Sequence, residues 1–429
     1  MKNDKIIILG AGLAGLSTAY HLENRDYEIF EKEDEVGGLC RSKTINGFTF
    51  DMDGHLLHFR NKYTLDLVSK LMNGNLKKQT RHSYVYFKNQ VIPFPFQAHL
   101  KNLSDDIKKE CFLGLIEARY NSSKYKQDGN FYSWMLNTFG SGITKHFMLP
   151  YNQKFWTIHP RRLDYDWAKR FVPVPNLEQI LEGTLTDKKV FIGYNRYFWY
   201  PLKGGINEIV YSFARHVKKV DTLHEATKID ILKKEIKFKN GKEIKFSKLI
   251  TTIPLPELQR LIKPLPLRVC RAFDKLRYTS IYNLNLGIDE VLTSGTHWMY
   301  FPQKQFIFFR VGFFNFISAH LVPEGKSSLY VEISYSKNKH LNRNNLYLRI
   351  LKDLEKAQII SHNSKVIVKD INDIKYGYII YDKDYQERRK AILDFLSKND
   401  IYSIGRYGSW QYMAMEDTIL DGKMVAEQL

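Results

Sequence analysis

The stretch that most constrains the fold of this chain is residues 6–42, IIILGAGLAGLSTAYHLENRDYEIFEKEDEVGGLCRS. Residues 6–9 form a short apolar run, typical of a parallel strand buried on both faces, and they lead directly into Gly10, Gly12 and Gly15. Gly10 permits a tight turn, Gly12 lets the backbone approach a pyrophosphate, and Gly15 lets the next helix pack closely. The pattern predicts a dinucleotide bound at a helix N-terminus, where unpaired N–H groups point at the phosphates.

An acidic residue and a glycine pair extend this signal. Glu31 ends a second predicted strand, residues 27–30, about 20 residues beyond the first glycine, where a carboxylate can bind an adenosine ribose hydroxyl. Gly37 and Gly38 follow, and then Arg41. The spacing from Glu31 to Arg41 resembles the extended fingerprint of two-dinucleotide-binding flavoproteins, which favours FAD over NAD. The structural alternative is a glycine-rich turn and an ordinary loop without a ligand.

Length and cysteine content narrow the class of protein. A chain of 429 residues is long enough for two or three domains and a large core. Cys40, Cys111 and Cys270 are odd in number and widely spaced, without a CxxC motif. We therefore expect a reducing, cytoplasmic location, no disulfide framework and no metal site. No run of about 18 apolar residues is present, so no transmembrane helix is expected.

The chain is basic, with 65 Lys and Arg against 46 Asp and Glu, a net charge of +19. Such a charge attracts phosphate-rich ligands, nucleic acid or an anionic membrane surface. The basic residues are dispersed as singlets and pairs, such as Lys108 and Lys109, which is typical of solvated faces. We therefore expect no nucleic-acid partner.

The remaining segments predict an α/β fold of three interleaved parts. Residues 81–97 are expected to form a β-hairpin, and a helix is expected after Ser104, a candidate N-cap. Alternating runs at 280–286, 306–311 and 329–335 predict an antiparallel sheet with one solvent-exposed face. The predicted parts are a discontinuous Rossmann-like FAD-binding domain (1–80, about 200–270 and about 385–429), an inserted helical domain (about 98–186) and an antiparallel sheet domain that binds the substrate (81–97, 187–199 and about 275–384).

Six short motifs, in this order and spacing, resemble the UDP-galactopyranose mutases, and the eukaryotic-type branch more than the common bacterial one. They are GHLLHF at 54–59, SYVYFKNQVIPFPFQ at 83–97, FMLPYNQKFW at 147–156, YPLKGG at 200–205, WMYFP at 298–302 with Arg310, and GRYGSWQY at 405–412. The resemblance covers nearly the whole chain. It implies the fold described above, with the active site in the cleft between the parts.

The resemblance also implies a reaction. Members of this family contract a UDP-linked pyranose to the furanose without net redox change, through a sugar adduct at N5 of reduced FAD. The cofactor does the difficult chemistry, so the protein must hold the diphosphate, exclude water and orient the sugar. NAD(P)H is a candidate reductant, and a homo-oligomer is left open. The product, a galactofuranose-type sugar, implies a role in cell-surface polysaccharide biosynthesis.

The site residues are implied by matching positions in the family. Arg310, Arg406 and His55 are expected to act in catalysis, the arginines as a clamp because their guanidinium groups bind phosphate oxygens bidentately. The substrate-binding positions are Arg81, Gln97, Phe147, Asn152, Trp156, Asn195, Trp298, Tyr300, Tyr378 and Tyr412, and the cofactor-binding positions are Gly10, Gly12, Gly15, Glu31, Gly38, Arg41, Gly54, Gly405 and Asp417. Ordinary ion pairs and core packing are the alternative interpretations of the arginines and the aromatic residues.

Several positions depart from the family pattern. Asp53 replaces the glycine usual before Gly54, and Phe94 stands where a tyrosine is common. Arg170 lies one position short of the family's sugar-site arginine. Ile379 and Ile380 replace prolines after Tyr378, and Ala414 stands where the bacterial branch has an aspartate. These differences leave the two clamp arginines unchanged and affect positions expected near the sugar, so the identity of the sugar stays open.

Two other functions are compatible with the N-terminal fingerprint. The first is an FAD-dependent oxidoreductase similar to amine oxidases and protoporphyrinogen oxidases, whose apolar or amine substrates do not require two arginines in the cleft. The second is a flavin-binding protein without catalytic activity. Release of UDP or of hydrogen peroxide would separate the mutase from the oxidase.

Overall fold

A computed structural model describes residues 5–121, 128–186, 190, 192–193 and 196–429. The predicted nucleotide-binding strand, β1, is the central strand of a five-stranded parallel sheet of order β20-β13-β1-β2-β9. Its strands are β1 (Ile6–Leu9), β2 (Tyr27–Phe30), β9 (Val220–Asp221), β13 (Lys248–Thr251) and β20 (Ile401–Ser403). Four consecutive buried apolar residues form β1, as expected for a central strand covered on both faces.

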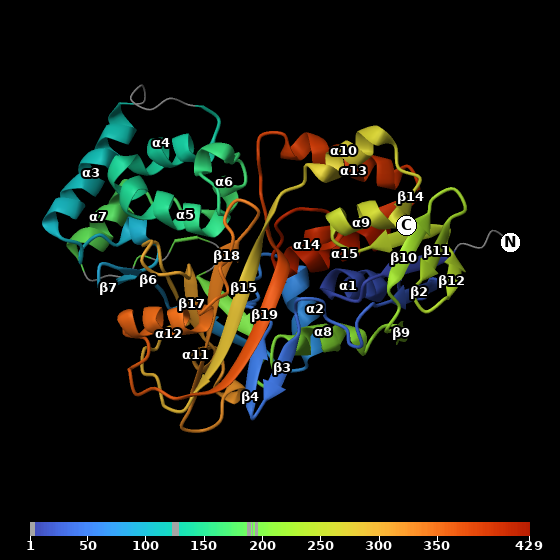
Figure 1. Cartoon of the computed structure of the whole chain (residues 1–429), viewed down its shortest axis with the longest axis horizontal. Coiled ribbons are helices and arrows are strands. Elements are labelled where there is room, and N and C mark those ends of the chain that lie inside the picture. Colours follow the sequence, from blue (N-terminus) through green and yellow to red (C-terminus); the bar gives the residue numbers. More distant parts are fainter. Residues whose placement is uncertain (1–4, 122–127, 187–189, 191, 194–195) are drawn as a thin grey trace.

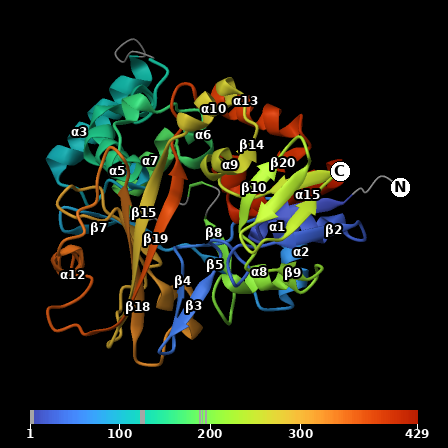
Figure 2. The ribbon, with the colours of Figure 1, turned by 45° about the vertical axis from the view of Figure 1, so that its right-hand side comes forward.

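The helices around this sheet come from both ends of the chain. The first helix packs extensively against the last, and the Ser17 hydroxyl donates to the Ile419 carbonyl oxygen at 2.7 Å. The first and last helices therefore lie side by side in the same part of the molecule, on the right of Figure 1 and nearer the viewer in Figure 2. The helices in this part are α1 (Leu13–Leu22), α2 (Lys62–Met72), α8 (Asn207–Ala214), α9 (Leu255–Leu261), α10 (Leu267–Asp274), α13 (Tyr385–Ser397), α14 (Gly405–Gly408) and α15 (Met415–Gln428).

Three small sheets accompany the parallel one. The largest has the order β12-β11-β10-β14, and the other two are the pairs β3-β4 and β5-β8. Their strands are β3 (Ser42–Ile45), β4 (Phe48–Asp51), β5 (Lys77–Thr80), β8 (Tyr197–Tyr200), β10 (Ala226–Asp230), β11 (Glu235–Phe238), β12 (Glu243–Lys245) and β14 (Ile262–Lys263).

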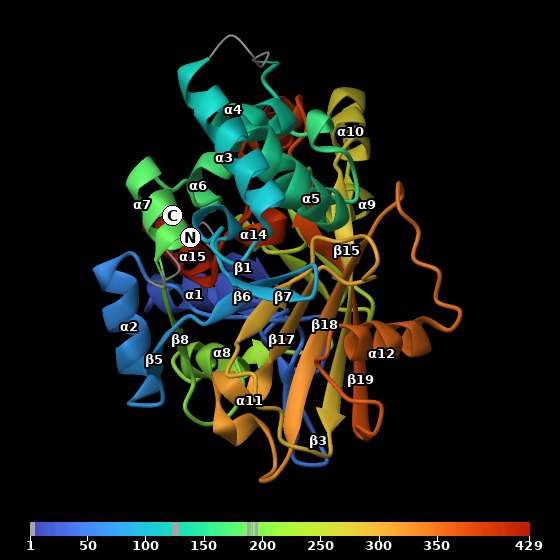
Figure 3. The same cartoon turned by 90° about the vertical axis from the view of Figure 1, so that its left-hand side faces the viewer.

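The helical segment follows the predicted β-hairpin and lies at the upper left of Figure 1, facing the viewer in Figure 3. It contains α3 (Asp105–Tyr120), α4 (Phe131–Ile143), a π-helical turn η2 (Thr144–Met148), α5 (Leu149–Trp156), α6 (Ala168–Phe171) and α7 (Leu177–Leu185), with short 3-10 turns η1 (Phe96–Ala98) and η3 (Pro160–Arg162). The helix after Ser104 is confirmed, but the Ser104 side chain makes no capping hydrogen bond.

The third part is a seven-stranded sheet of order β19-β15-β18-β17-β16-β6-β7. The hairpin at 81–97 is confirmed and forms its edge. The strands are β6 (Ser83–Phe87), β7 (Gln90–Pro93), β15 (Tyr278–Ile288), β16 (Trp298–Tyr300), β17 (Arg310–Phe313), β18 (Ser327–Tyr335) and β19 (Val366–Ile379); the helices beside them are α11 (Phe314–Ile317), the 3-10 turn η4 (Ala319–Leu321) and α12 (Leu346–Lys356).

The predicted strands β15, β17 and β18 pair antiparallel, as expected, and one parallel pair, β16 with β6, connects them to the hairpin. Two other predictions about this sheet were wrong. Residues 306–309 are not a strand, and β17 begins only at Arg310. The sheet also lacks the expected solvent-exposed face, since β15 and β18 are almost wholly buried. One face packs its apolar side chains under α12, while the opposite face carries polar residues such as Glu332 and Asn283 that are buried inside the molecule.

Candidate active site

The main cavity of the described chain has a volume of ≈ 840 Å³ and is lined by all three parts. One end is formed by the β1–α1 turn and Glu31, and the middle by residues 37–41, 53–56 and 404–407. The other end is aromatic. Its walls there are Phe94, Tyr151, Phe155, Trp156, Phe171, Trp298, Tyr300, Tyr378 and Tyr412. A long cavity with a glycine-lined end and an aromatic end is suited to an extended ligand with both phosphates and rings.

The β1–α1 turn has the geometry that the sequence predicted. Gly10 has a φ of 100°, and a Cβ at Gly15 would lie 2.0 Å from the Gly10 carbonyl oxygen. A Cβ at Gly12, by contrast, would meet nothing in the protein closer than the Gly38 Cα at 3.8 Å. Packing within the chain therefore explains the glycine at 15 but not the one at 12, which lines the cavity at the N-terminus of α1. A ligand phosphate close to the backbone explains it.

Glu31 and Arg41 also line the cavity. The buried Glu31 carboxylate accepts hydrogen bonds from Ala11 N at 2.7 Å and Glu33 N at 3.1 Å. A carboxylate has about four acceptor positions, so capacity for ribose hydroxyls remains. Arg41 Nε donates to the Gly38 carbonyl oxygen at 2.9 Å, which ties the glycine pair to the cavity wall. These residues fit the adenosine diphosphate half of FAD.

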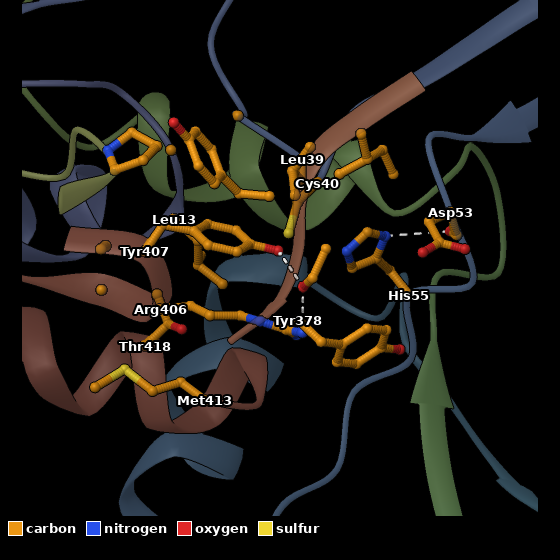
Figure 4. Close-up of a pocket in the computed structure, with 18 of the residues that line it drawn as sticks. Leu13, Leu39, Cys40, Asp53, His55, Tyr378, Arg406, Tyr407, Met413 and Thr418 are labelled. Atoms are coloured by element: carbon orange, nitrogen blue, oxygen red, sulfur yellow. Dashed lines mark hydrogen bonds between the residues drawn. The ribbon is translucent and has the colours of Figure 1, made fainter. Parts of the chain in front are cut away.

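Arg406 stands in the middle of the cavity on α14. Its Nη2 donates to the Gly377 carbonyl oxygen at 3.0 Å, and the Tyr407 hydroxyl donates to the same oxygen at 3.1 Å, as Figure 4 shows. The guanidinium lies over the rings of Tyr412 at 4.4 Å and Tyr378 at 5.0 Å. Its Nε has no hydrogen-bond partner, and no carboxylate of the described residues forms an ion pair with it.

Arg310 is held differently, by a carboxylate of the neighbouring strand. It lies directly opposite Glu332 in the β17–β18 register, and its Nη2 donates to Glu332 Oε1 at 2.7 Å while Nε donates to Oε2. Three of the five N–H groups of the guanidinium remain for a ligand. Burial lowers the pKa of Arg310, but the charge and hydrogen bonds of Glu332, together with the neighbouring Tyr330 and Tyr378, outweigh this effect, and the pKa ends well above its ordinary value.

His55 lies between Arg406 and Asp53 in the cavity, as Figure 4 shows. Burial lowers its pKa, and the positive charges of Arg406 and Arg310 lower it further, although Asp53 acts in the opposite direction. His55 is therefore neutral at pH 7. Its Nδ1 donates to the Asp53 carbonyl oxygen at 3.1 Å, which leaves Nε2 as an acceptor.

The structure brings most of the predicted site residues to this one cavity. Those lining it are Gly10, Gly12, Glu31, Gly38, Arg41, Gly54, His55, Trp156, Trp298, Tyr300, Arg310, Tyr378, Gly405, Arg406 and Tyr412. Trp156 and Trp298 are both more than nine-tenths buried, and their indole N–H groups have no partner in the described chain. The two nitrogen atoms are themselves covered by the surrounding protein, so it is the rings and not these donors that face the cavity.

Six predicted residues lie elsewhere. Gly15 is behind the turn, and Arg81 is buried with its guanidinium 4.9 Å from the Phe94 ring centre. Gln97 donates to the Pro173 carbonyl oxygen, Phe147 stacks between Phe96 and Tyr151, and Asn152 donates to the Met148 carbonyl oxygen. Asp417 accepts from Ala414 N and pairs with Arg60 and Arg170. Asn195 falls outside the described residues. The assigned roles of all these residues stay predictions.

Several residues that line the cavity were not among the predicted site residues. Tyr151 and Phe155 belong to α5, whose FMLPYNQKFW motif was noted, and their spacing of four residues places both on one helix face. Tyr407 and Phe171 also line the cavity. Glu332 gave no signal, because only the β17–β18 register brings it to Arg310. Among the described residues, no cluster of three or more metal-ligating side chains is placed to hold a metal ion.

Comparison with known proteins identifies the family. A model of the family described as flavin-containing amine oxidoreductase matches residues 13–429. The chain belongs to this family. Membership implies FAD as the cofactor, and it confirms the predicted α/β fold class with a Rossmann-like nucleotide-binding part.

Solved structures extend the comparison. A crystal structure of reduced UDP-galactopyranose mutase superimposes with a TM-score of 0.94 at 27% identity, covering 99% of this chain and 95% of that one. Cyclohexylamine oxidase from Brevibacterium oxydans IH-35A superimposes with a TM-score of 0.70 at 12% identity, over 99% of this chain and 98% of that one. The second likeness shows the shared flavoprotein fold alone.

Relatives found by sequence are of a different kind. A 4,4'-diapophytoene desaturase from Methylomonas sp is 24% identical over 408 residues, which cover 79% of this chain and 75% of the desaturase. A 4,4'-diapolycopene oxygenase from the same source is 42% identical over only 57 residues, 13% of this chain and 12% of that protein.

Among the described residues, no helix is long and apolar enough to cross a membrane.

Proposed function

We propose that this flavin-containing amine oxidoreductase family member is a UDP-sugar mutase that interconverts the pyranose and furanose forms of UDP-galactose or a related sugar. The proposal includes a cytoplasmic location, with galactofuranose-type sugars supplied to cell-surface polysaccharides. The observation that carries it is Arg406, a half-buried guanidinium that faces the cavity without an acidic partner among the described residues. A buried charge without a partner is costly, so a ligand anion is its expected counter-ion.

The two arginines together suit a diphosphate. Arg310 and Arg406 come from β17 and α14, and Tyr378 lies beside both of them. Guanidinium groups bind phosphate oxygens through charge-assisted hydrogen bonds and stabilise the negative charge of a departing UDP. Burial raises the pKa of Tyr378 well above its ordinary value, so its hydroxyl keeps its proton and can donate to the same phosphates. Tyr412 lies parallel to Tyr378 with 6.1 Å between the ring centres.

The aromatic end of the cavity suits the uracil base. Tyr151 and Phe155 lie on one face of α5, and Phe155 is 4.3 Å from the Tyr378 ring centre. Trp156 also lines this end of the cavity and adds a further aromatic ring to its wall. Aromatic faces stack on a base, and such walls exclude the water that would hydrolyse a reactive sugar.

The cofactor is assigned to the glycine-lined end and the middle of the cavity. Gly12, Glu31 and Arg41 would hold the adenosine diphosphate half, and His55 and Gly54 would face the ring system. Reduced FAD would supply a nucleophilic ring nitrogen, and NAD(P)H is a candidate reductant. Neutral His55 presents Nε2 as a hydrogen-bond acceptor for a ligand hydroxyl.

A second candidate is an FAD-dependent oxidoreductase of the desaturase or oxidase type. The match over 408 residues to the Methylomonas desaturase favours it. The two arginines in the cavity count against it, since an apolar polyene or a neutral amine offers no counter-charge for Arg406.

The deciding experiment is product analysis with the purified protein. Dithionite-reduced protein is incubated with UDP-galactose and with other UDP-sugars, and the mixture is separated by anion-exchange chromatography. A new UDP-linked isomer of unchanged mass supports the mutase, and heat-inactivated protein is the control. Failure of every UDP-sugar to isomerise, together with oxygen consumption on a polyene or amine substrate, contradicts the proposal and supports the oxidoreductase.

A further inference from the structure

A lysine amine lies inside the protein beside the proposed nucleotide site. Lys154 belongs to α5 and is buried, with 9% of the residue exposed. Its Nζ donates hydrogen bonds to four backbone carbonyl oxygens, those of Phe301 at 2.7 Å, Gln303 at 2.6 Å, Phe306 at 2.9 Å and Phe308 at 3.0 Å. These four oxygens form a carbonyl cage around the amine.

The carbonyl cage has the composition of a site for a monovalent cation. Backbone carbonyl oxygens can replace the water around such an ion. An ammonium group has three N–H donors, so the four oxygens offer it one acceptor more than it has donors. Burial, aided by the charge of Lys339, lowers the pKa of Lys154 to about 7, although Asp353 on α12 acts in the opposite direction. At pH 6 the amine is therefore protonated, and the cage holds a positive charge.

The carbonyl cage is formed by the loop that joins β16 to β17. Tyr300 ends β16 and Arg310 begins β17, the two residues are paired in the strand register, and both line the cavity. Phe301 N donates to the Phe309 carbonyl oxygen at 2.8 Å, which closes the base of the loop. The position of Arg310 therefore depends on the conformation of this loop, and hence on the amine that the loop surrounds.

The helix that carries Lys154 also forms part of the aromatic end of the cavity. Tyr151 and Phe155 of α5 lie three residues before and one residue after Lys154, and both line the cavity. Phe155 contacts Phe309 of the loop edge to face, with 5.2 Å between the ring centres. One lysine therefore connects the wall assigned to the base with the loop that leads to the arginine assigned to the diphosphate.

We propose that Lys154 is a positioning residue for the nucleotide, whose ammonium group serves as a built-in cation that sets the distance between the aromatic wall on α5 and Arg310 on β17. A nucleoside diphosphate needs both groups at once, because its base stacks on the wall and its diphosphate binds the arginine. Without a cation the four buried carbonyl oxygens lose their donor, which is costly, and the loop opens away from α5. This inference rests on the proposed function, since that function places the base and the diphosphate at these two groups.

Lys154→Met tests the role of the charge, because methionine keeps an unbranched apolar side chain without a donor. The affinity of the oxidised FAD-bound protein for UDP is measured by calorimetric titration at pH 6. We expect it to fall about 10- to 100-fold, as for a binding group misplaced by about 1 Å. FAD content should not change, because other segments form the glycine-lined end. Lys304→Met removes an exposed lysine of the same loop, and this matched control should bind UDP like the parent.

A cation supplied from solution separates positioning from a loss of packing. Lys154→Ala removes three carbon atoms and the amine, which propylammonium matches atom for atom. Propylammonium chloride should raise the UDP affinity of Lys154→Ala by about tenfold, equivalent to about 1.4 kcal/mol. Tetramethylammonium chloride at the same concentration carries the same charge without an N–H donor and should have no such effect. The parent and Lys304→Met should respond alike to the two salts.

The outcomes are distinct. Recovery of UDP affinity in propylammonium alone supports the inference, as does recovery of folding in propylammonium alone. If Lys154→Ala folds in neither salt, Lys154→Met decides: weaker UDP binding with FAD retained supports the inference. UDP affinity in Lys154→Met equal to that of the parent contradicts it, and so does a folded Lys154→Ala that responds equally to both salts. Both contradictions leave the proposed function intact, whereas a parent protein that binds no UDP contradicts the proposed function and this inference with it.

Discussion

At the scale of single residues, Arg310 and Arg406 differ in how the protein compensates their charge. Arg310 has a carboxylate bound to its guanidinium, whereas Arg406 has a carbonyl oxygen and aromatic faces. Removal of each side chain therefore has different consequences for folding, although both are expected to weaken binding of a diphosphate.

Replacement of Arg406 by Ala should weaken UDP binding by about 2–5 kcal/mol, the usual cost of truncating one partner of a buried charge pair. The stability of the free protein should hold or rise, because no buried acid loses its partner. Calorimetric titration with UDP and thermal unfolding measure the two effects. Arg170→Ala removes an exposed arginine that does not line the cavity and is the control. Unchanged UDP affinity in Arg406→Ala would place the nucleotide elsewhere.

Replacement of Arg310 by Met should destabilise the protein by about 3–5 kcal/mol, because it leaves Glu332 buried and uncompensated. The double variant Arg310→Met with Glu332→Gln should recover most of that loss, since no charge is then left without a partner. Urea unfolding of the parent, the two single variants and the double variant gives the coupling energy. A double variant as unstable as Arg310→Met would show that packing, not charge, is responsible.

The sequence motifs located both arginines but not the partner of either. Arg310 and Glu332 are 22 positions apart, and their contact depends on the β17–β18 register, which alternation alone does not define. Asp53 was noted as a departure from the family pattern, and only the folded chain shows that its carbonyl oxygen accepts a hydrogen bond from His55 in the cavity.

At the scale of elements, two glycines of the β1–α1 turn have different roles: packing within the chain requires Gly15, whereas only a bound ligand would require Gly12. Gly12 has extended backbone angles that alanine also adopts, with φ −74° and ψ −179°. Gly12→Ala should therefore keep the stability of the apoprotein or raise it by about 0.4–1 kcal/mol. Its methyl group should crowd the pyrophosphate and weaken FAD binding by about 1–3 kcal/mol, as in an overpacked contact. Flavin fluorescence titration of the apoprotein measures this loss.

Gly15→Ala is the contrasting variant of the same turn. Its Cβ would lie 2.0 Å from a backbone oxygen, so the apoprotein itself should lose about 1–3 kcal/mol of stability. Thermal unfolding of both apoproteins compares them. If Gly12→Ala binds FAD like the parent, the turn does not contact the pyrophosphate.

Asp51 joins three elements through its side chain. Its buried carboxylate accepts from Ser42 on β3, from Tyr200 on β8 and from the N–H of Ile206 before α8. Burial raises its pKa to about 6, although these hydrogen bonds lower it. Between pH 4 and 6 the unfolded chain loses the Asp51 proton while the folded chain keeps it, so this group costs stability as the pH rises.

The cost from Asp51 should reach about 3 kcal/mol above pH 6, since one pKa unit corresponds to about 1.4 kcal/mol. Asp51→Asn has no proton to lose, and it retains an oxygen acceptor. The difference in unfolding free energy between the variant and the parent should therefore move in favour of the variant as the pH rises from 4 to 6.5. A constant difference over this range would mean that the Asp51 pKa is not raised in the folded protein.

Hydrophobic patterns in the sequence predicted where strands form, but they did not predict which face of the sheet meets water. The apolar run of β1 and the hairpin β6–β7 were predicted correctly. The alternation in β15 and β18 distinguishes two faces, but the polar face is turned inward to the cavity and to β3–β4 rather than to water. Alternation gives the chemical difference between faces and does not say what covers them.

At the scale of the whole molecule, the cavity depends on segments far apart in the sequence. The β1–α1 turn, α5, β17 and α14 span residues 6–408, and each contributes side chains or backbone to the same space. The family motifs indicated most of these positions, because each motif is a short continuous stretch that can be recognised without knowing the fold. The boundaries of the three predicted domains stay a prediction. All three parts line the same cavity, and the strands of the parallel sheet come from positions between residues 6 and 403.

The last prediction concerns the electron balance of the whole reaction. Pyranose and furanose forms of a UDP-sugar are isomers, so their interconversion neither consumes nor produces electrons. A cavity that holds the diphosphate on Arg310 and Arg406 can stabilise UDP as it departs and keep it for the return step, which an oxidase has no need to do.

Protein with oxidised FAD should be inactive, because an oxidised flavin ring is electrophilic. Protein reduced once, under anaerobic conditions, should convert many equivalents of UDP-sugar with no further reductant. Chromatography of the nucleotide-sugars and the flavin absorbance, recorded on the same sample, measure product and redox state together. One NAD(P)H or one oxygen consumed for each product would contradict the mutase and establish the oxidoreductase.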